Sequence, residues 1–490
     1  MGEFDRHRAL QPRVARFPHF AHAARAKLRE KFVRADAAAT GHKLTKDTPL
    51  KAAPPDGPRD VILTGIMSLA GRIRDLKTGF TSTFWVANTL ELFERLAFYG
   101  SKAILAVYVA EKIGLGAQLA ATLVGAFSGV LYSLPIVAGT FVDRYGFRRT
   151  LAACFAFFTV GYFLIGLAGL SMGQPVVDVF GKGPYITGVL FLTAAGGSLI
   201  KPCIVGTVAN TSTEQTRSLG YSIYYTLVNL GGALGPILAL QIREGMGIEY
   251  VLIMSSITSL CMLIGTLLFF REPVTREPGG RSLPQVFRDM VLVFGNFRFI
   301  LFLVIFSGFY IMFWQIFYSL PFYARESLRF EQFELLETVD AATIILLTVP
   351  LTALAKSLRP ITAMATGFGI AGLAWLLIPL APSPGMVVAA VALFAIGEGL
   401  MAPRFYEYVA GLAPKEQVGT YMGFAFLPVA IGSFAAGPLA GWLVSTFVQG
   451  GGNPQHMWLV VSAVGLVSTI AMILYNALLV RDGDPGTARG

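Results

Sequence analysis

The sequence predicts an all-α, multi-pass membrane protein with twelve transmembrane helices in two six-helix bundles, and three observations support this prediction. Of its 490 residues, 54% are apolar and 14% are charged, whereas a soluble domain is about 25% charged. Apolar runs of about 20 residues recur along the chain, and each is long enough to span a bilayer. A basic segment, residues 271–298, separates these runs into six and six.

The N-terminal region, residues 1–80, is expected to be a basic cytoplasmic tail. Arginine and lysine outnumber acidic residues from Arg6 to Arg34, and a proline-rich stretch follows. This charge favours a tail attracted to anionic lipid, with an organellar targeting segment as the alternative. The apolar core of a secretory signal is not recognised. Residues 61–76 repeat apolar side chains at helical spacing, which predicts a short helix on the membrane surface.

The first six apolar runs are expected to form an N-terminal bundle over residues 81–270. The last six are expected to form a C-terminal bundle over residues 299–480, followed by a cytoplasmic tail, 481–490. The eighth run is the weakest because it opens with Glu334, Glu337 and Asp340. The expected spans are 84–110, 119–141, 150–171, 184–209, 218–241, 250–270, 299–323, 333–355, 360–380, 385–410, 420–446 and 456–480.

The linker, residues 271–298, is expected on the cytoplasmic side, where it continues from Leu283 to Phe297 as a second interfacial helix. Lysine and arginine favour cytoplasmic loops, and with both termini inside, the inner loops are more than twice as rich in them as the outer loops. We expect the plasma or inner membrane, with an organelle membrane as the alternative. The expected outer loops carry Lys112, Lys182, Arg243, Arg325 and Arg329.

Composition and spacing argue against several other classes of protein. The chain contains no basic soluble domain for nucleic acid, so its partners are expected to be a small solute, protons and lipid. Cys154, Cys203 and Cys261 lie far apart in the spans, so neither a disulfide nor a metal site is expected. No nucleophile–base motif or phosphate loop is recognised, so we expect neither an enzyme nor a cofactor. We expect a monomer.

The first span carries an unusual charged stripe. Glu91, Glu94, Arg95 and Lys102 lie in an otherwise apolar run, and helical spacing places them on one face. Charge inside a bilayer is costly and persists mostly where it has a function. No histidine lies in the membrane core, so a proton relay would have to use carboxylates. The stripe therefore predicts a polar solute or proton pathway; the alternative is a buried network that only orients helices.

The loop from Gly139 to Thr150 resembles the conserved cytoplasmic loop of the major facilitator superfamily. The spacing of its glycines, aspartate and arginines carries the resemblance. In that superfamily the cluster latches the two halves in one access state. The resemblance therefore implies a gating role for Asp143, Arg144, Arg148 and Arg149.

Residues 91–100, Glu-Leu-Phe-Glu-Arg-Leu-Ala-Phe-Tyr-Gly, closely resemble the Glu-x-x-Glu-Arg-Phe-x-Tyr-Tyr-Gly signature of the proton-dependent oligopeptide transporter family. Further matches follow in the same order along the chain. They are Tyr132 before a proline, Lys201 after a Gly-Gly pair, Asn229 in span 5 and Glu398 in span 10.

This resemblance implies a secondary transporter that carries di- or tripeptides, or similar zwitterions, together with protons. The residues themselves favour such a solute, because Arg95, Lys102 and Lys201 make the first half cationic and Glu398 makes the second half acidic. A zwitterion would align between the two. The implied proton-coupling residues are Glu91, Glu94, Arg95 and Lys201. The implied substrate-binding residues are Tyr99, Lys102, Tyr132, Lys201, Asn229, Trp314 and Glu398.

Coupling is expected to work through linked protonation. We expect Glu91 to pair with Arg95 at i, i+4 and Glu94 to approach Lys201, so that proton affinity changes with the access state.

The chain also departs from the family pattern. Lys102 replaces an arginine, Phe98 replaces a tyrosine, and Tyr318 lies where the family has a glutamate in span 7. That glutamate takes part in proton movement, so its loss leaves coupling open, and Asp340 is one candidate substitute. The alternatives are therefore a related carrier of another organic anion or zwitterion without strict proton coupling, or a membrane receptor that does not transport.

Overall fold

The computed structural model describes residues 79–480 except 215, 274–282 and 414–417. The described residues belong to one compact unit. The expected tail with its helix over 61–76, and the expected C-terminal tail, fall outside the described residues. The division of the chain into a tail, two bundles and a linker therefore stays a prediction.

The described part of the chain is almost entirely helical, with one isolated β-bridge between Phe80 and Ser212. Its first half contains α3 (Ser82–Val107), η1 (Tyr108–Lys112), α4 (Gly116–Ser133), α5 (Pro135–Tyr145), α6 (Phe147–Leu167), η2 (Ser171–Gly173), α7 (Gln174–Phe180), α8 (Lys182–Gly197), α9 (Ile200–Thr211), α10 (Arg217–Gly245) and α11 (Ile248–Phe269).

The second half follows a short helix, α12 (Leu283–Phe294), which lies where the linker helix was expected. Its position on a membrane surface stays a prediction. The other elements are α13 (Phe297–Tyr318), α14 (Leu320–Phe322), η3 (Tyr323–Ser327), α15 (Phe333–Ser357), α16 (Pro360–Ala374), α17 (Leu377–Leu380), α18 (Pro384–Leu412), α19 (Val418–Phe424), α20 (Leu427–Leu443), η5 (Val444–Val448) and α21 (His456–Leu479).

Ten helices in the described part are long and apolar enough to cross a membrane, and α4 with α5 forms an eleventh candidate that bends by 48°, so up to eleven of the twelve predicted spans are confirmed. The bend follows from Pro135, which cannot donate its backbone hydrogen bond. The first predicted span forms the 26-residue helix α3, which carries the charged stripe and is not among these apolar helices, so its crossing of the membrane stays a prediction. The eighth span, the least certain in the sequence, is present as α15.

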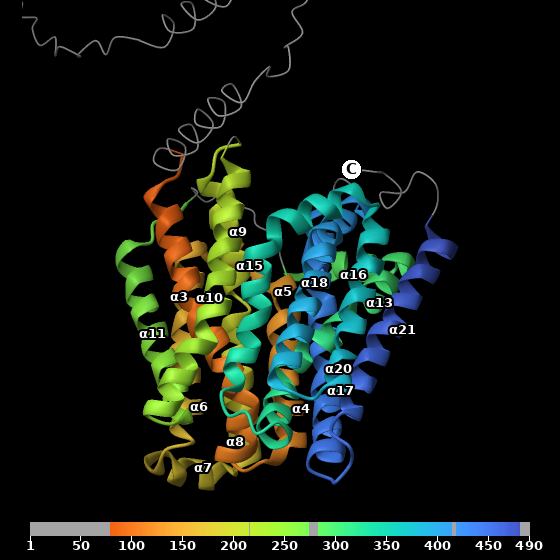
Figure 1. Ribbon diagram of the computed structural model, residues 1–490. Coiled ribbons are helices and arrows are strands. Elements are labelled where there is room, and N and C mark those ends of the chain that lie inside the picture. Colours follow the sequence, from red (N-terminus) through yellow and green to blue (C-terminus); the bar gives the residue numbers. More distant parts are fainter. Residues whose placement is uncertain (1–78, 215, 274–282, 414–417, 481–490) are drawn as a thin grey trace, which may run out of the picture. The chain divides into compact units, whose positions relative to one another are not determined.

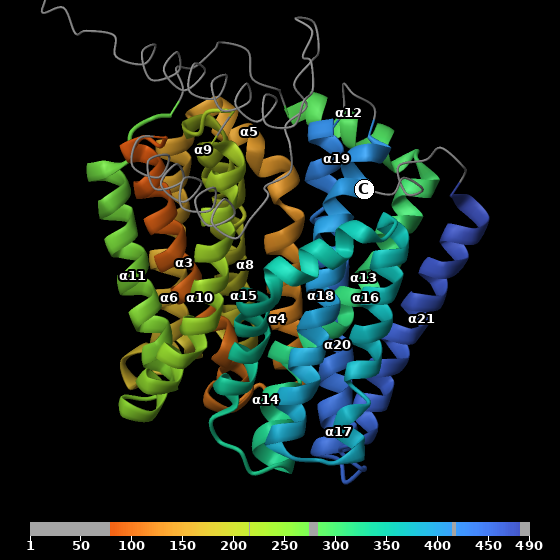
Figure 2. The same cartoon turned by 45° about the horizontal axis from the view of Figure 1, so that its top comes forward.

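Each half packs mainly on itself, and two helix pairs make the largest contacts between the halves. In the first half α3 packs on α10 and α11, and α6 on α8 and α11; in the second, α13 packs on α20 and α21, and α16 on α18 and α21. Figures 1 and 2 show these first-half helices on one side and the second-half helices on the other. Between the halves, α4 packs on α20, and α10 packs on α15.

The α4–α20 contact depends on glycine. A Cβ atom on Gly125 would lie 2.7 Å from Gly437 Cα, and one on Gly437 would lie 2.6 Å from the Ala121 carbonyl oxygen. Ser433 Oγ donates to the Gly125 carbonyl at 2.9 Å across the same crossing. Small residues therefore allow the two backbones to touch.

Among the described residues, two ion pairs join the halves at the end of the molecule where α3 ends and α4 begins. We call this the α3–α4 end. Arg243 Nε lies 2.5 Å from Glu334 Oε1, and its Nη2 donates to the Glu331 carbonyl at 2.8 Å. Arg325 Nη1 lies 2.5 Å from Glu111 Oε1. Together with the glycine crossing, these contacts close the α3–α4 end.

Candidate functional site

The charged stripe of α3 is a buried ion-pair cluster. Glu91, Glu94 and Arg95 are each at most 3% exposed. Arg95 Nε lies 3.3 Å from Glu91 Oε1, which confirms the expected i, i+4 contact, and it also donates to Glu94 Oε2. Gly231 of α10 lies directly against Arg95, leaving no room for a side chain there. The close approach of α10 therefore helps to seal the cluster from lipid.

Lys201 reaches the cluster from α9. Its Nζ lies 3.5 Å from Glu91 Oε1 and donates to the Tyr224 hydroxyl at 2.9 Å. We expected Lys201 to approach Glu94, and this state instead pairs it with Glu91. Glu91 therefore faces two cations, whereas the ion pair of Glu94 is with Arg95. The reason is tertiary, because the angle at which α9 crosses α3 decides which turn Lys201 meets.

Lys102 lies two turns further along α3, toward the α3–α4 end, and is 2% exposed. Its Nζ donates to Ser128 Oγ at 2.8 Å and lies 3.6 Å from the centroid of the Trp314 ring. Tyr132 also packs near that indole, with ring centroids 5.8 Å apart. Three expected site residues, Lys102, Tyr132 and Trp314, are thus brought together from both halves.

Tyr318, at the position where the family pattern has a glutamate, makes neutral contacts. Its ring stacks on Trp314 at 5.5 Å, and its hydroxyl shares a hydrogen bond of 2.8 Å with Ser433 Oγ. The hydroxyl also donates to the Val124 carbonyl at 3.4 Å. Tyr318 therefore bridges the halves by hydrogen bonds without supplying a negative charge to Lys102.

The acidic side of the site lies on α15 and α18. Asp340 and Glu398 are partly exposed, and each has one buried carboxylate oxygen without a hydrogen-bond partner, Oδ1 and Oε2 respectively. The charge of Asp340 acts on Glu398, and both charges act on Tyr99 and Tyr225 of the first half. Asp340 and Glu398 therefore share one electrostatic environment with these tyrosines, and substrate binding by Glu398 stays a prediction.

Asn229 contributes less than the pattern suggested. Its Nδ2 donates to the Tyr225 carbonyl at 2.9 Å, which is the preceding turn of its own helix. A substrate contact by Asn229 therefore stays a prediction that needs this amide to turn away from its own backbone.

Sequence reasoning did not assign Glu337 to the site. This carboxyl is 3% exposed, neither of its oxygens has a hydrogen-bond partner, and its charge acts on Lys102. The signal was already in the sequence, because Glu337 was one of the acids that made the eighth span irregular. Such an acid in a confirmed span is a functional candidate by default.

The loop from Gly139 to Thr150, for which a gating role was expected, is hydrogen-bonded to the start of the linker. Glu272 accepts hydrogen bonds from the backbone nitrogens of Phe147 and Arg148 at 2.6 and 3.1 Å, which fits a carboxylate at a helix N-terminus. The Arg148 side chain donates to the Leu267 carbonyl. Asp143, Arg144 and Arg149 lie exposed beside it. A latch between the halves made by these four residues stays a prediction.

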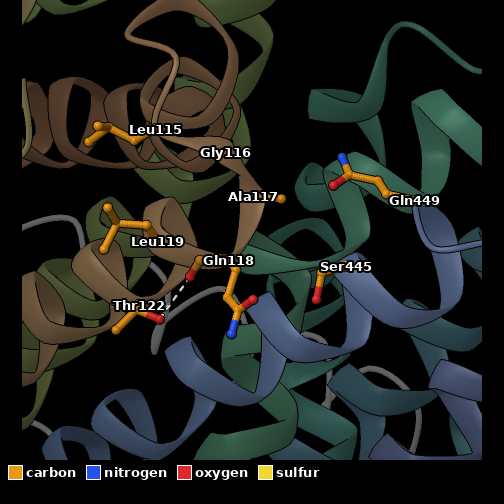
Figure 3. A pocket seen from close by; sticks show the side chains of 8 residues that line it. All are labelled: Leu115, Gly116, Ala117, Gln118, Leu119, Thr122, Ser445 and Gln449. Atoms are coloured by element: carbon orange, nitrogen blue, oxygen red, sulfur yellow. Dashed lines mark hydrogen bonds between the residues drawn. The ribbon is translucent and has the colours of Figure 1, made fainter.

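A hollow of about 500 Å³ lies at the α3–α4 end, away from these residues. Figure 3 shows Gln118 and Thr122 of α4 on one side of it and Ser445 and Gln449 on the other. The hollow opens at the seam between the halves. It contains none of the expected site residues.

The family model described as Major Facilitator Superfamily matches residues 90–339 and 330–489. Together these matches cover most of the chain, including all of the candidate site residues.

Individual relatives are distant. A dipeptide and tripeptide permease B from Photorhabdus asymbiotica is 28% identical over 43% of this chain and 41% of its own length. The chain thus matches about two fifths of that curated relative. YqjV of Bacillus subtilis, an uncharacterised transporter of the superfamily, is 23% identical over 78% of this chain and 91% of its own length.

A solved structure of a POT family transporter in complex with 5-aminolevulinic acid superimposes with a TM-score of 0.69. The match covers 81% of this chain and 96% of that one, at 18% sequence identity. At this identity the likeness establishes the fold.

Proposed function

The chain belongs to the major facilitator superfamily, and we propose that it is a secondary active transporter for short peptides or similar zwitterions, driven by protons. The observation that carries the proposal is the distribution of charge across the two halves. In the first half Arg95, Lys102 and Lys201 outnumber Glu91 and Glu94, and the second half contributes Asp340 and Glu398. A solute with a carboxylate at one end and an amine at the other would be oriented by that field.

The amine of the solute would be bound by Glu398 and Asp340. Each has an oxygen without a hydrogen-bond partner, and a substrate ammonium could donate to both. The carboxylate of the solute would be bound by Lys201, which is the most exposed cation of the cluster, with 17% of its side chain accessible. Tyr99, Tyr132 and Trp314 would form the walls between these ends.

Alternating access is the second part of the proposal. The α3–α4 end is closed by the glycine crossing and by two ion pairs. We propose that this end faces outward, because the arginine-rich loops after α5 and α11 lie at the other end. The state described here would then be one that exchanges solute with the cytoplasm.

Proton coupling would use the carboxylates of α3. Glu91 is held by Arg95 and Lys201 at 3.3 and 3.5 Å. A substrate carboxylate that competes for Lys201 would remove one of these cations and so favour a proton on the cluster. Peptide binding and proton binding would then be linked.

One observation favours a second candidate function. Tyr318 leaves Lys102 without the acidic partner that the family pattern places on this helix, and Lys102 is bonded to the neutral Ser128. This favours a related carrier of another organic anion or zwitterion that moves its solute without strict proton coupling.

Uptake into proteoliposomes tests the proposal directly. Dipeptides, tripeptides and free amino acids would be compared with and without an imposed pH gradient. We expect accumulation of peptides above the external concentration only with the gradient. Equal uptake with and without the gradient would favour the second candidate, and binding without any uptake would indicate a receptor.

A pair of variants tests the amine site. Glu398→Gln should weaken uptake of a dipeptide by about one to two orders of magnitude, because the substrate ammonium loses a charged hydrogen bond. An N-acetylated dipeptide, which lacks that ammonium, should be affected less. Glu407→Gln on the same helix is the matched control, since that side chain is 54% exposed and pairs with Arg404. Equal loss for both peptides would remove Glu398 from the amine site.

A further inference from the structure

Glu337 and Lys102 are buried ionisable groups on α15 and α3, two helices of opposite halves that contact each other. Glu337 lies on α15 and is 3% exposed, and Lys102 lies on α3 and is 2% exposed. Other fully buried acids of the described part form ion pairs, as Glu334 does with Arg243 and Glu91 with Arg95. Glu337 and Lys102 are not in direct contact, and both oxygens of Glu337 have no donor.

Lys102 is the cation whose charge acts on Glu337, which makes it the candidate ion-pair partner of that carboxyl. The charged groups that act on Glu337 are Lys102 and the like-charged Glu334, whose own charge is taken up by Arg243 of α10. The titratable group nearest to Lys102 on α13 is Tyr318, whose ring centroid lies 5.7 Å from Nζ and which is engaged with Ser433. On its own helix Lys102 is influenced by Arg95, which repels it.

A buried carboxylate without a donor is much less favourable than a neutral carboxyl group or a direct ion pair at the same place. Two arrangements therefore satisfy both groups. In one, a proton neutralises Glu337 while Lys102 rests on Trp314 and Ser128, as observed. In the other, the proton has left, and the Lys102 ammonium forms an ion pair with the Glu337 carboxylate. The two arrangements differ by one proton and by one bond between the halves.

We propose that Glu337 is the proton-binding group that acts on Lys102, and that its protonation state decides whether α3 and α15 are joined by an ion pair. This inference rests on the proposed function. It places on α15 a carboxyl group that Tyr318 does not supply on α13. The sequence had offered Asp340 as the substitute for the glutamate missing from span 7. The charge of Asp340, however, acts on Glu398 and Tyr99, so we assign the proton site to Glu337 instead.

The first test is transport by the full-length protein in proteoliposomes. A gradient of one pH unit can accumulate a substrate about tenfold for each proton carried with it. We expect Glu337→Gln to lose this accumulation while it still exchanges labelled dipeptide for unlabelled dipeptide without a gradient. Glu407→Gln, an acid-to-amide change at an exposed position of α18, should keep both. Wild-type accumulation in Glu337→Gln would overturn the inference.

The second test does not depend on the substrate. Infrared difference spectra between acid and neutral pH report carboxyl groups that gain a proton, and they can be measured on the wild type and each variant in lipid nanodiscs. We expect Glu337→Gln to lose one carboxyl band and Lys102→Gln to shift the same band to a different pH. Retention of every band in Glu337→Gln would overturn the inference. If the wild type shows no gradient-driven uptake but the band is lost, the proposed coupling fails while Glu337 remains a protonation site.

Discussion

At the scale of single residues, the balance of buried charge decides what each member of the cluster does. Glu91 forms ion pairs with Arg95 and Lys201, and Glu94 accepts a hydrogen bond from Arg95. The family pattern treats these two acids alike, but the contacts make them unequal in this state. Glu91 joins two helices, α3 and α9, whereas the Glu94 ion pair remains within α3.

This inequality predicts a difference in stability between two conservative variants. Glu91→Gln keeps the shape of the side chain but leaves Arg95 and Lys201 with one acid, and breaking a buried pair costs about 3–5 kcal/mol. We expect Glu91→Gln to lower the thermal midpoint in detergent more than Glu94→Gln does, as followed by tryptophan fluorescence. Asp178→Asn, at an exposed position of α7, serves as the control. A larger loss for Glu94→Gln would contradict the pairing.

At the scale of helices, backbone approach determines how closely the halves can close. The crossing of α4 and α20 places Gly125 and Gly437 in backbone contact, and Pro135 bends the α4–α5 span away from it by 48°. One span therefore combines a tight contact at the α3–α4 end with a divergent second part. A straight helix could not do both.

The crossing predicts the effect of bulk at Gly437. Valine there would collide with the Ala121 carbonyl and with Gly125, and overpacking of this kind costs about 1–3 kcal/mol. Because the cost falls on the closed end alone, we expect Gly437→Val to slow dipeptide exchange without unfolding the protein. Gly188→Val on α8 is the matched control, since a Cβ at that position meets nothing within 4 Å. Equal rates in the two variants would show that the crossing does not limit transport.

At the scale of the whole molecule, the two halves repeat one device at the closed end. The first long helix of each half leads into a π-helical turn: η1 follows α3, and η3 follows α13 and the short α14. Glu111 of η1 pairs with Arg325 of η3 across the halves, and Gln449, just after η5, donates to Glu326 of η3 at 2.9 Å within the second half. Such turns break the regular helix ladder, and two of them meet here through the Glu111–Arg325 pair.

The closed end should open when its better-buried ion pair is broken. Glu334 is fully buried and Arg243 is 18% exposed, so Arg243→Glu places two like charges together in the seam. Spin labels at Lys182 and Asn453, after replacement of the native cysteines, would report the separation of the halves at this end. We expect Arg243→Glu to lengthen that distance and the exchange Arg243→Glu/Glu334→Arg to restore it. An unchanged distance in Arg243→Glu would mean that the pair does not hold the end closed.

Much of the fold could be predicted from the sequence because bilayer thickness fixes the length of each apolar run. Even the eighth span, with its three acids, formed the helix α15. The bend at Pro135 and the breaks after Gly197 and Tyr318 were not anticipated, although prolines and glycines lie at or near these positions. Their consequences depend on which neighbouring helix the chain must meet.

By itself, the sequence determined that the chain crosses a membrane as two sets of helices and that one helix carries a charged stripe, because hydropathy and helical period are local properties. Only the tertiary structure decided which charges meet. Lys201 meets Glu91, and Trp314 meets Lys102, although these residues lie far apart in the chain. The absence of a hydrogen-bond partner for the Glu337 carboxyl also depends on how the helices pack around it. Electrostatic energy depends on separations of a few ångströms, and the crossing angles of whole helices set those separations.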